Sequence, residues 1–519
     1  MSQPLLAKGN DVFTLAVELP GFVSLAAQVA LANMTRIALL TIDNAFLGHL
    51  GTTPLAAASL ATVWIQVPLF SVWAMSSSLV TLCGQAYGAQ NYKLMGIWLQ
   101  MALVLVSILS LPVILWYWSI EIILSKASDD EEVVKLGVVF SRIMSLSVWP
   151  ALTYACLRQY LQAMHIVAPT TIIGITSIGI AVLANYTLIY GVDTWQGFGF
   201  DGSPLATVIA SWFQPIALFF YGFLYKKYHK RAWGGWCLAE HTQSRWRTFL
   251  TMALPLGLND GLTFLANSCI ALIVARLGVQ ILASNAIFLT LWVMLWALSF
   301  GVGCATQIKV ATHLGAGHAI RARATSFLGF SVVITSTSVV ITILWICKYA
   351  VLRIFTSDIY LIQHCIDVLP LYLCAYAFDA LEITMTAILN GMGEMPFVSG
   401  VSLFGMWGVQ LPLAYIFAIV YKLGLHGIWI GYTLTALFKL SVLSFKYFNI
   451  NWNIAALKAM SAMEAIEAIE EETLQDEESL IRLHKDSSRF RLECAIPSPA
   501  NAVLEGCQEG NWWHHKEIP

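Results

Sequence analysis

The chain has 519 residues, of which 58% are hydrophobic and 11% are charged, with 28 Lys and Arg against 30 Asp and Glu. An ordinary soluble domain carries roughly 25% charged residues, and a disordered chain is poorer in apolar side chains. The composition therefore excludes a nucleic-acid-binding protein, a secreted disulfide scaffold and an ordinary cytosolic enzyme. It indicates a polytopic membrane protein that lies in a lipid bilayer.

Twelve apolar stretches follow one another along the chain, and each is long enough to cross a membrane as a helix of about 20 residues. Lipid offers no partners to backbone amides, and none of the stretches alternates like a β-barrel strand, so each predicts a helix. The predicted fold class is all-α, with twelve transmembrane helices. The predicted spans are 22–47, 55–82, 96–123, 134–157, 168–191, 203–225, 249–275, 282–308, 325–349, 362–389, 397–421 and 425–448.

Basic residues gather on one side of the predicted membrane. Twelve lie on the side of the N-terminus and four on the opposite side, which by the positive-inside rule places both termini in the cytosol. We expect a multi-pass protein of the plasma membrane, the vacuole or another endomembrane. The larger group is Lys8, Lys93, Arg158, Lys226, Lys227, Lys230, Arg231, Arg245, Arg247, Lys309, Arg321 and Arg323, and the smaller is Lys126, Arg276, Arg353 and Lys422.

The two halves of the chain share short patterns at a constant offset. His49-Leu50-Gly51 returns 227 residues later as Arg276-Leu277-Gly278, and Gly88-Ala89 returns at the same offset as Gly315-Ala316. Parallel repeats with an even number of helices are related by an axis along the membrane normal, and the substrate path lies between them. The sequence therefore predicts two six-helix lobes related by a pseudo-two-fold axis along the membrane normal, an architecture typical of transporters.

The predicted organisation has five parts. In the tail, an amphipathic helix is expected between Leu457 and Leu483, followed by disorder. The parts are a cytosolic N-terminus (1–21), an N-lobe (22–225), a basic cytosolic loop (226–248), a C-lobe (249–448) and an acidic, largely disordered cytosolic tail (449–519).

The motifs that the sequence lacks limit the energy sources that the predicted transporter can use. The chain has no GxxxxGK[ST] phosphate loop, and it has neither an HExxH nor a GxSxG pattern. We therefore expect neither an ATP-driven pump nor an enzyme. The expected protein is a secondary transporter that needs no cofactor and uses a proton or sodium gradient.

The loop region after the second predicted span, Thr81-Leu82-Cys83-Gly84-Gln85-Ala86-Tyr87-Gly88-Ala89-Gln90, closely resembles the multidrug and toxic compound extrusion (MATE) family, eukaryotic branch. Asp43-Asn44-Ala45-Phe46-Leu47-Gly48-His49 and Gly199-Phe200-Asp201-Gly202-Ser203-Pro204 agree with it. The resemblance covers about residues 12–448. It implies two six-helix lobes and the export of organic solutes in exchange for protons or sodium.

Asp43 is the first candidate for the coupling residue. A charge within a membrane span is costly, and burial of a carboxyl group favours its protonated form, so such a group can bind and release a proton. The resemblance places Asn185 and Thr207 beside Asp43, and these three side chains could alternatively hold sodium. A further acidic position of the family is Ile189 here, which weakens the sodium interpretation. The structural alternative is an ion pair with Arg36 on the same helix face.

Asp379 is the second candidate, since it matches an acidic position of the family's second lobe. Tyr376, three residues earlier, could donate a hydrogen bond to it. Glu382 lies three residues later, and two carboxylates on one helix face favour protonation of one of them. The structural alternative is a salt bridge from Asp379 to Lys439.

The seventh predicted span departs from the family pattern. Where most eukaryotic relatives place a glutamate, this chain has Thr263. Asp260, one turn earlier, is a candidate substitute. It could equally be an interfacial residue beside Asn259.

The sequence thus predicts a monomeric secondary antiporter that exports small organic, cationic compounds in exchange for protons or sodium by alternating access between two lobes. The protonatable residues proposed for coupling are Asp43 and Asp379. Two alternatives are kept: an organic-anion exporter of the same family, for citrate or a phenolic conjugate, and a lipid flippase of the wider superfamily.

Overall fold

The computed structural model describes residues 15–228, 233, 235–236 and 240–461. Within these residues the chain is helical without a β-strand, apart from one isolated bridge between Val192 and Trp195. The described part of the chain holds twelve helical stretches that are long and apolar enough to cross a membrane, and each contains or overlaps one of the predicted spans. The all-α prediction is confirmed.

The N-lobe contains the first six spans. Its transmembrane elements are α1 (Leu15–Leu50), α2 (Thr52–Ser76) with α3 (Ser78–Gly88), α4 (Tyr92–Trp118), α6 (Glu131–Met144) with η1 (Ser145–Ser147) and α7 (Val148–Ala163), α8 (Ala168–Tyr190), and η2 (Gly199–Asp201) with α9 (Gly202–Phe219) and η3 (Phe220–Tyr225). A short helix, α5 (Glu121–Ala127), lies between the third and fourth spans.

The C-lobe repeats this order. Its elements are α11 (Gln243–Ala275), α12 (Val279–Gly315), α13 (Ala319–Ile346), the short α14 (Lys348–Phe355), α15 (Ile359–Gly391), α16 (Met395–Phe404) with η5 (Gly405–Gln410), α17 (Leu411–Tyr415) and η6 (Ile416–Val420), and α18 (Leu425–Phe448). Aromatic rings fill its interior: Phe288 stacks on Tyr372 with ring centroids 4.6 Å apart, and Trp292 lies 5.4 Å from Trp429.

The internal repeat appears in the backbone. Gly51 and Gly278, which are 227 residues apart, precede α2 and α12 with φ angles of 140° and 109°. Side chains with a Cβ rarely adopt such angles, so glycine is needed where each chain turns into its second span. The second span of each half ends at corresponding glycines, Gly88 and Gly315.

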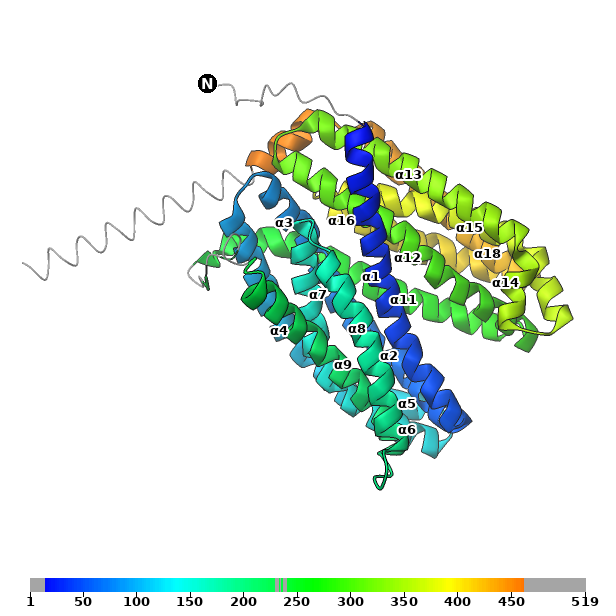
Figure 1. Ribbon diagram of the computed structural model, residues 1–519. Coiled ribbons are helices and arrows are strands. Elements are labelled where there is room, and N and C mark those ends of the chain that lie inside the picture. Colours follow the sequence, from blue (N-terminus) through cyan, green and yellow to red (C-terminus); the bar gives the residue numbers. More distant parts are fainter. Residues whose placement is uncertain (1–14, 229–232, 234, 237–239, 462–519) are drawn as a thin grey trace, which may run out of the picture. The chain divides into compact units, whose positions relative to one another are not determined.

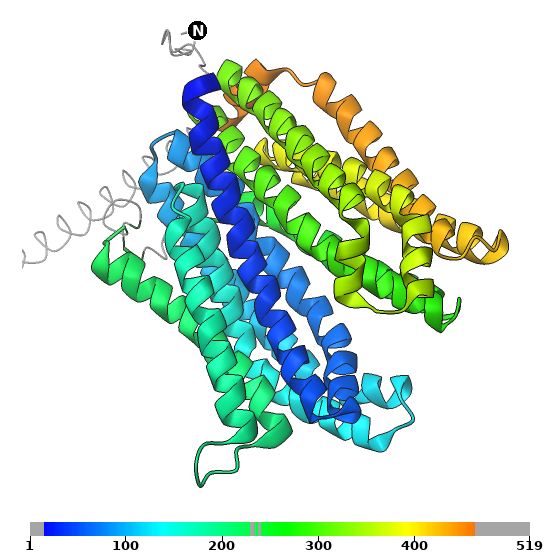
Figure 2. The ribbon, with the colours of Figure 1, turned by 45° about the vertical axis from the view of Figure 1, so that its right-hand side comes forward.

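The two lobes meet where these second spans end. The Thr81 hydroxyl donates to the Asn390 carbonyl oxygen at 2.9 Å, and the Gln85 side chain donates to the Gly391 carbonyl oxygen at 3.2 Å. A Cβ on Gly88 would overlap the backbone of Thr312. Both views show N-lobe and C-lobe helices close together at the end where α1 begins (Figures 1 and 2).

An ion pair joins the lobes at the same end. α1 packs along α12, and the Glu18 carboxylate lies 2.5 Å from the Lys309 ammonium. The two side chains are 29% and 12% exposed, so solvent screens this pair less than a surface pair. Lys309, which the sequence placed among the loop residues, is therefore part of an interhelical contact.

Loss of this ion pair should destabilise the folded protein. Glu18→Gln or Lys309→Gln should each lower the free energy of unfolding by roughly 1–3 kcal/mol, because each leaves a partly buried charge without its partner. The double exchange Glu18→Lys with Lys309→Glu should recover part of the loss. Thermal unfolding in detergent measures the change in stability of each variant. Lys135→Gln is the control, since it removes an exposed ion pair whose side chains, Lys135 and Glu131, are 76% and 89% exposed. Equal effects of the buried and exposed changes would contradict this role.

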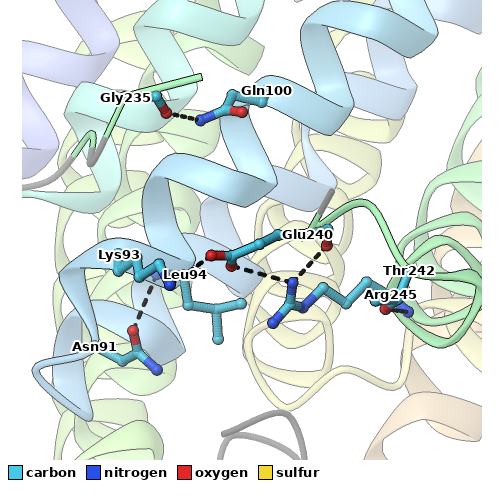
Figure 3. A network of polar contacts seen from close by, with 8 residues as sticks. All are labelled: Asn91, Lys93, Leu94, Gln100, Gly235, Glu240, Thr242 and Arg245. Carbon is cyan, nitrogen blue, oxygen red and sulfur yellow. Dashed lines mark hydrogen bonds and ion pairs between the residues drawn. The ribbon is translucent and has the colours of Figure 1, made fainter. Parts of the chain in front are cut away.

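The segment between the lobes is held to both of them at its described residues. The Glu240 carboxylate lies 2.5 Å from the Lys93 ammonium of α4 and 3.4 Å from the Arg245 guanidinium in the first turn of α11. The Gln100 side chain of α4 donates to the Gly235 carbonyl oxygen at 2.6 Å. Figure 3 shows these contacts around the start of α4. Glu240 thus connects a helix of the N-lobe to a helix of the C-lobe.

The chain continues beyond α18 as a helix over residues 452–461. Its Ala456 and Ala459 are buried in a cluster with Val310 and Leu314 of α12. This first part of the predicted tail therefore packs on the C-lobe. Most of the amphipathic helix and all of the disorder predicted for the tail lie outside the described residues, as do residues 1–14 of the predicted cytosolic N-terminus.

Candidate functional site

The N-lobe encloses a cavity of about 160 Å³ between its helices. Its walls come from five helices, and both apolar and charged side chains face it. The lining residues are Ala32, Thr35, Arg36, Leu39 and Asp43 of α1, Gln66, Leu69, Phe70 and Trp73 of α2, Ala151, Leu152, Tyr154, Ala155 and Arg158 of α7, Ala181 of α8, and Thr207, Ala210, Ser211 and Gln214 of α9.

Asp43 lies at one end of this cavity, where α1, α8 and α9 converge. It is 8% exposed, and its two carboxyl oxygens have different partners. The Asn185 amide donates to Oδ1 at 3.0 Å, and the Thr207 hydroxyl donates to Oδ2. Asn185 is fully buried and also donates to the Ala181 carbonyl oxygen, which fixes its orientation. The structure therefore brings together the three N-lobe residues named from the sequence.

This arrangement suits a carboxyl group that changes its protonation state. The two neutral donors satisfy Asp43 when it is ionised, yet they carry no charge that would hold it in that form. The Asn185 Oδ1 atom is buried and has no hydrogen-bond partner among the described residues. Together with Asp43 and Thr207 it presents a set of oxygen atoms, the kind of ligand that a hard cation prefers.

Arg36 does not pair with Asp43 in the described structure, so the structural alternative for Asp43 is wrong. The Arg36 guanidinium carbon instead lies 4.9 Å from the ring centre of Trp73 and 5.8 Å from that of Phe70. Asp43 keeps its two partners on α8 and α9. The carboxyl group is thus free to respond to protons without breaking an ion pair.

Arg158 lines the cavity, although its sequence position predicted a cytosolic basic residue outside the spans. It lies inside the fourth span and is 3% exposed, and its guanidinium carbon lies 5.8 Å from the ring centre of Trp73. Its position in Cys156-Leu157-Arg158-Gln159-Tyr160, one turn before the end of α7, resembles a loop boundary when only hydropathy is read. A continued helical period would have placed it on the face of Tyr154 and Ala151, toward the other spans.

The second candidate cluster lies between α15 and α18 of the C-lobe. Here the ion pair to Lys439 is made by Glu382, at 3.4 Å, and not by Asp379. The Thr386 hydroxyl donates to Glu382 at 3.0 Å. Asp379 is half-buried and interacts with both Glu382 and Lys439 through their charges. The expected acid pair is present, but its members are unequal, because Glu382 holds the cation.

Tyr376 does not donate to Asp379, contrary to the expectation from the sequence. Its hydroxyl donates to the Leu295 carbonyl oxygen at 3.5 Å and accepts from Ser299 at 3.2 Å. Side chains three residues apart on a helix differ in direction by about 300°, which is about 60° short of a full turn. A small change in helix geometry therefore decides which neighbour the hydroxyl reaches. Tyr376 therefore joins α15 to α12.

Asp260 of α11 has one described side-chain partner, the neighbouring Asn259 amide at 3.0 Å. The Thr263 hydroxyl, at the position of the family's glutamate, is buried and has no hydrogen-bond partner in the described part of the chain. On the same helix, a Cβ on Gly257 would overlap Met75 and the Ser71 backbone of α2. The Asp260 segment thus lies where α11 crosses the N-lobe, and Asp260 stays a candidate coupling residue.

Comparison with known proteins agrees with this architecture. Residues 29–187 and 255–416, more than half of the chain, match the MatE family, one stretch in each lobe. Multidrug and toxin extrusion protein 1 of Rattus norvegicus is 29% identical over 446 residues, which cover 85% of this chain and 77% of that protein. Protein DETOXIFICATION 17 of Arabidopsis thaliana is 26% identical over 464 residues, covering 88% of this chain and 96% of that protein.

A solved structure agrees at the level of the fold. The crystal structure of the eukaryotic MATE transporter AtDTX14 superposes with a TM-score of 0.77 and 21% identity, covering 86% of this chain and 99% of that one. The arrangement of twelve helices in two six-helix lobes is therefore the one predicted from the internal repeat. The matched stretches contain the motifs that suggested the family, and the chain belongs to the MatE family of multidrug and toxin extrusion transporters.

Proposed function

We propose that the protein is a secondary antiporter that exports small organic compounds in exchange for protons. The observation that carries this proposal is Asp43, a buried carboxyl group between two neutral donors in the wall of the N-lobe cavity. Coupling by a proton is preferred over sodium, because Ile189 removes an acidic ligand that the family pattern would supply.

The proposed cycle uses the two lobes and Asp43. Protonation of Asp43 from the outside weakens the hydrogen bonds that Asn185 and Thr207 donate to the carboxylate, since a protonated oxygen is a poorer acceptor. The packing of α1 against α8 and α9 then changes, and substrate leaves outward. Deprotonation toward the cytosol restores the bonds and resets the site. Asp379, with Glu382 and Lys439 beside it, is a second protonatable group in the C-lobe.

We further propose that both termini lie in the cytosol and that the chain works as a monomer without a cofactor. The proposed lobes span residues 22–225 and 249–448. Removing Arg158 and Lys309 from the loop residues still leaves the basic excess on the side of the N-terminus, since the segment between the lobes, Lys93, Arg321 and Arg323 remain there.

One observation favours a second candidate for the substrate. The N-lobe cavity presents two guanidinium groups, those of Arg36 and Arg158, and one carboxyl group. Such a cavity repels a cation and attracts an anion, so the organic-anion exporter is the alternative that this lobe supports.

Substrate flux into proteoliposomes under an imposed pH gradient tests the antiport proposal. Uptake should require the gradient, collapse with a protonophore, and be the same in sodium-free and sodium-containing buffer. Uptake driven by a sodium gradient alone would show that sodium, and not the proton, is the coupling ion at Asp43. Gradient-independent uptake would overturn antiport altogether.

A further inference from the structure

Two arginine side chains of the N-lobe cavity have no part in the proposed coupling site. Arg158 is 3% exposed, and the Nε atoms of both Arg36 and Arg158 are buried with no hydrogen-bond partner in the described part of the chain. Across the ranges that the structure describes, neither guanidinium forms an ion pair or a hydrogen bond. Their contacts are with aromatic faces, chiefly that of Trp73, which both guanidinium groups approach.

This situation is electrostatically costly. Two like charges within membrane spans face the same indole ring. A cation–π contact compensates for only part of the hydration free energy that each guanidinium loses on burial. In the C-lobe, by contrast, the partly buried Lys439 has a counter-charge, since its ammonium lies 3.4 Å from the Glu382 carboxylate. Among the described residues, Arg36 and Arg158 of the N-lobe have no such counter-charge, so their donors are available to a ligand in the cavity.

Asp43 does not supply the missing charge. It lies seven residues from Arg36 on α1, about 10 Å along the helix axis, and its oxygens are taken by Asn185 and Thr207. Leu39 and Phe70 line the cavity as well. The cavity therefore has a cationic part at Arg36 and Arg158, an apolar wall, and a separate protonatable group.

We propose that this cavity binds a small organic anion, whose carboxylate, sulfonate or phosphate group is held by Arg36 and Arg158 and whose apolar body lies against Phe70 and Leu39. Guanidinium groups suit this task because their fixed fork of N–H donors matches the oxygens of such groups. The inference rests on the proposed function in taking the cavity as the substrate site, and it names the substrate class.

Binding to the purified full-length protein tests the inference without transport. Isothermal titration in nanodiscs would compare three ligands of matched shape: benzoate, neutral benzamide and cationic benzylammonium. Phenyl phosphate and benzenesulfonate extend the anionic arm. We expect at least one anion to bind at least tenfold more tightly than benzamide and benzylammonium, because charge-assisted hydrogen bonds to a guanidinium are worth about this factor.

Variants assign the binding to these side chains. Arg158→Gln and Arg36→Gln should each weaken the preferred anion by about tenfold or more, and Arg158→Lys should retain part of the affinity. Arg142→Gln is the matched control, since Arg142 is a half-exposed arginine that pairs with Glu121 at 3.5 Å. If Arg158→Gln does not fold, Arg36→Gln alone carries the same test, and unchanged binding of the preferred anion to Arg36→Gln would then overturn the inference.

Two outcomes would overturn the inference. One is that no anion of the series binds better than benzamide. The other is that the preferred anion binds unchanged to the double variant Arg36→Gln, Arg158→Gln. Asp43→Asn separates this inference from the proposed function: anion binding should persist or tighten there, because a negative charge is removed, whereas gradient-driven transport should be lost. Gradient-driven transport by a protein that binds no anion would support the antiport proposal and refute the anion site.

Discussion

Asp43→Asn should abolish substrate transport driven by a pH gradient while the protein stays folded. Asparagine has nearly the same shape as aspartate and can still accept a hydrogen bond from Thr207 or Asn185, so the packing of α1, α8 and α9 is kept. It cannot take up a proton. We expect gradient-driven uptake in proteoliposomes to fall to about 1% of the wild-type rate or less, because the loss of an essential proton-transfer group costs roughly 10²-fold or more.

The control for this experiment is a carboxylate outside the cavity. Asp193 lies in the exposed turn after α8, and Asp193→Asn should transport like the wild type. Thermal unfolding in detergent checks that Asp43→Asn is folded. Full gradient-driven transport by the double variant Asp43→Asn, Asp379→Asn would refute coupling through either of the two proposed carboxyl groups.

Gly88→Val should prevent the lobes from packing as they do at the end near the N-terminus. A Cβ at Gly88 would overlap the carbonyl group of Thr312 and the amide of Ala316, and a Cβ at its counterpart Gly315 would overlap the backbone of Gln85. Backbone atoms cannot move aside as a flexible side chain can. Overpacking of this kind costs about 1–3 kcal/mol or more, which displaces a conformational equilibrium by roughly 5- to 150-fold.

The expected result is loss of transport together with exposure of the lobe contact. A cysteine placed at Thr81, which bonds to Asn390 across the lobes, reports this exposure through its rate of reaction with a membrane-impermeant maleimide. The rate should rise in the Gly88→Val background. Gly179→Val is the matched control, because a Cβ at Gly179 of α8 meets no atom within 4 Å. An unchanged labelling rate with normal transport in Gly88→Val would mean that this packing has no role in the cycle.

Much of the fold could be predicted because lipid leaves few alternatives. A stretch of about 20 apolar residues has to be a helix, and an even-numbered repeat determines the relation between the halves. The ends of the helices were harder to predict. α7 continues past the predicted boundary at residue 157, because Arg158, Gln159 and Gln162 face other helices and not lipid. Hydropathy does not distinguish a polar residue in a loop from one in a protein interior.

The candidate site was predictable in part for a related reason. Family resemblance placed Asp43, Asn185 and Thr207 on three helices, and the fold brings these side chains together. Which carboxylate takes Lys439 was not predictable, because Asp379 and Glu382 are less than one turn apart and a modest helix rotation exchanges them. Spacing along one helix identifies neighbours on that helix, whereas partners across helices depend on packing that a single sequence does not contain.

The bridge from Glu240 to Lys93 and Arg245 has a mechanical consequence. It ties the starts of α4 and α11 together at one end of two bundles, and α12, with 37 residues, extends about 55 Å from end to end. If that end acts as a pivot, a rotation of roughly 10° between the lobes moves the far ends by about 10 Å. The turns at Gly51 and Gly278, at the ends of the lobes far from the pivot, then move farthest. The N-lobe cavity, midway along α1, moves through a smaller distance.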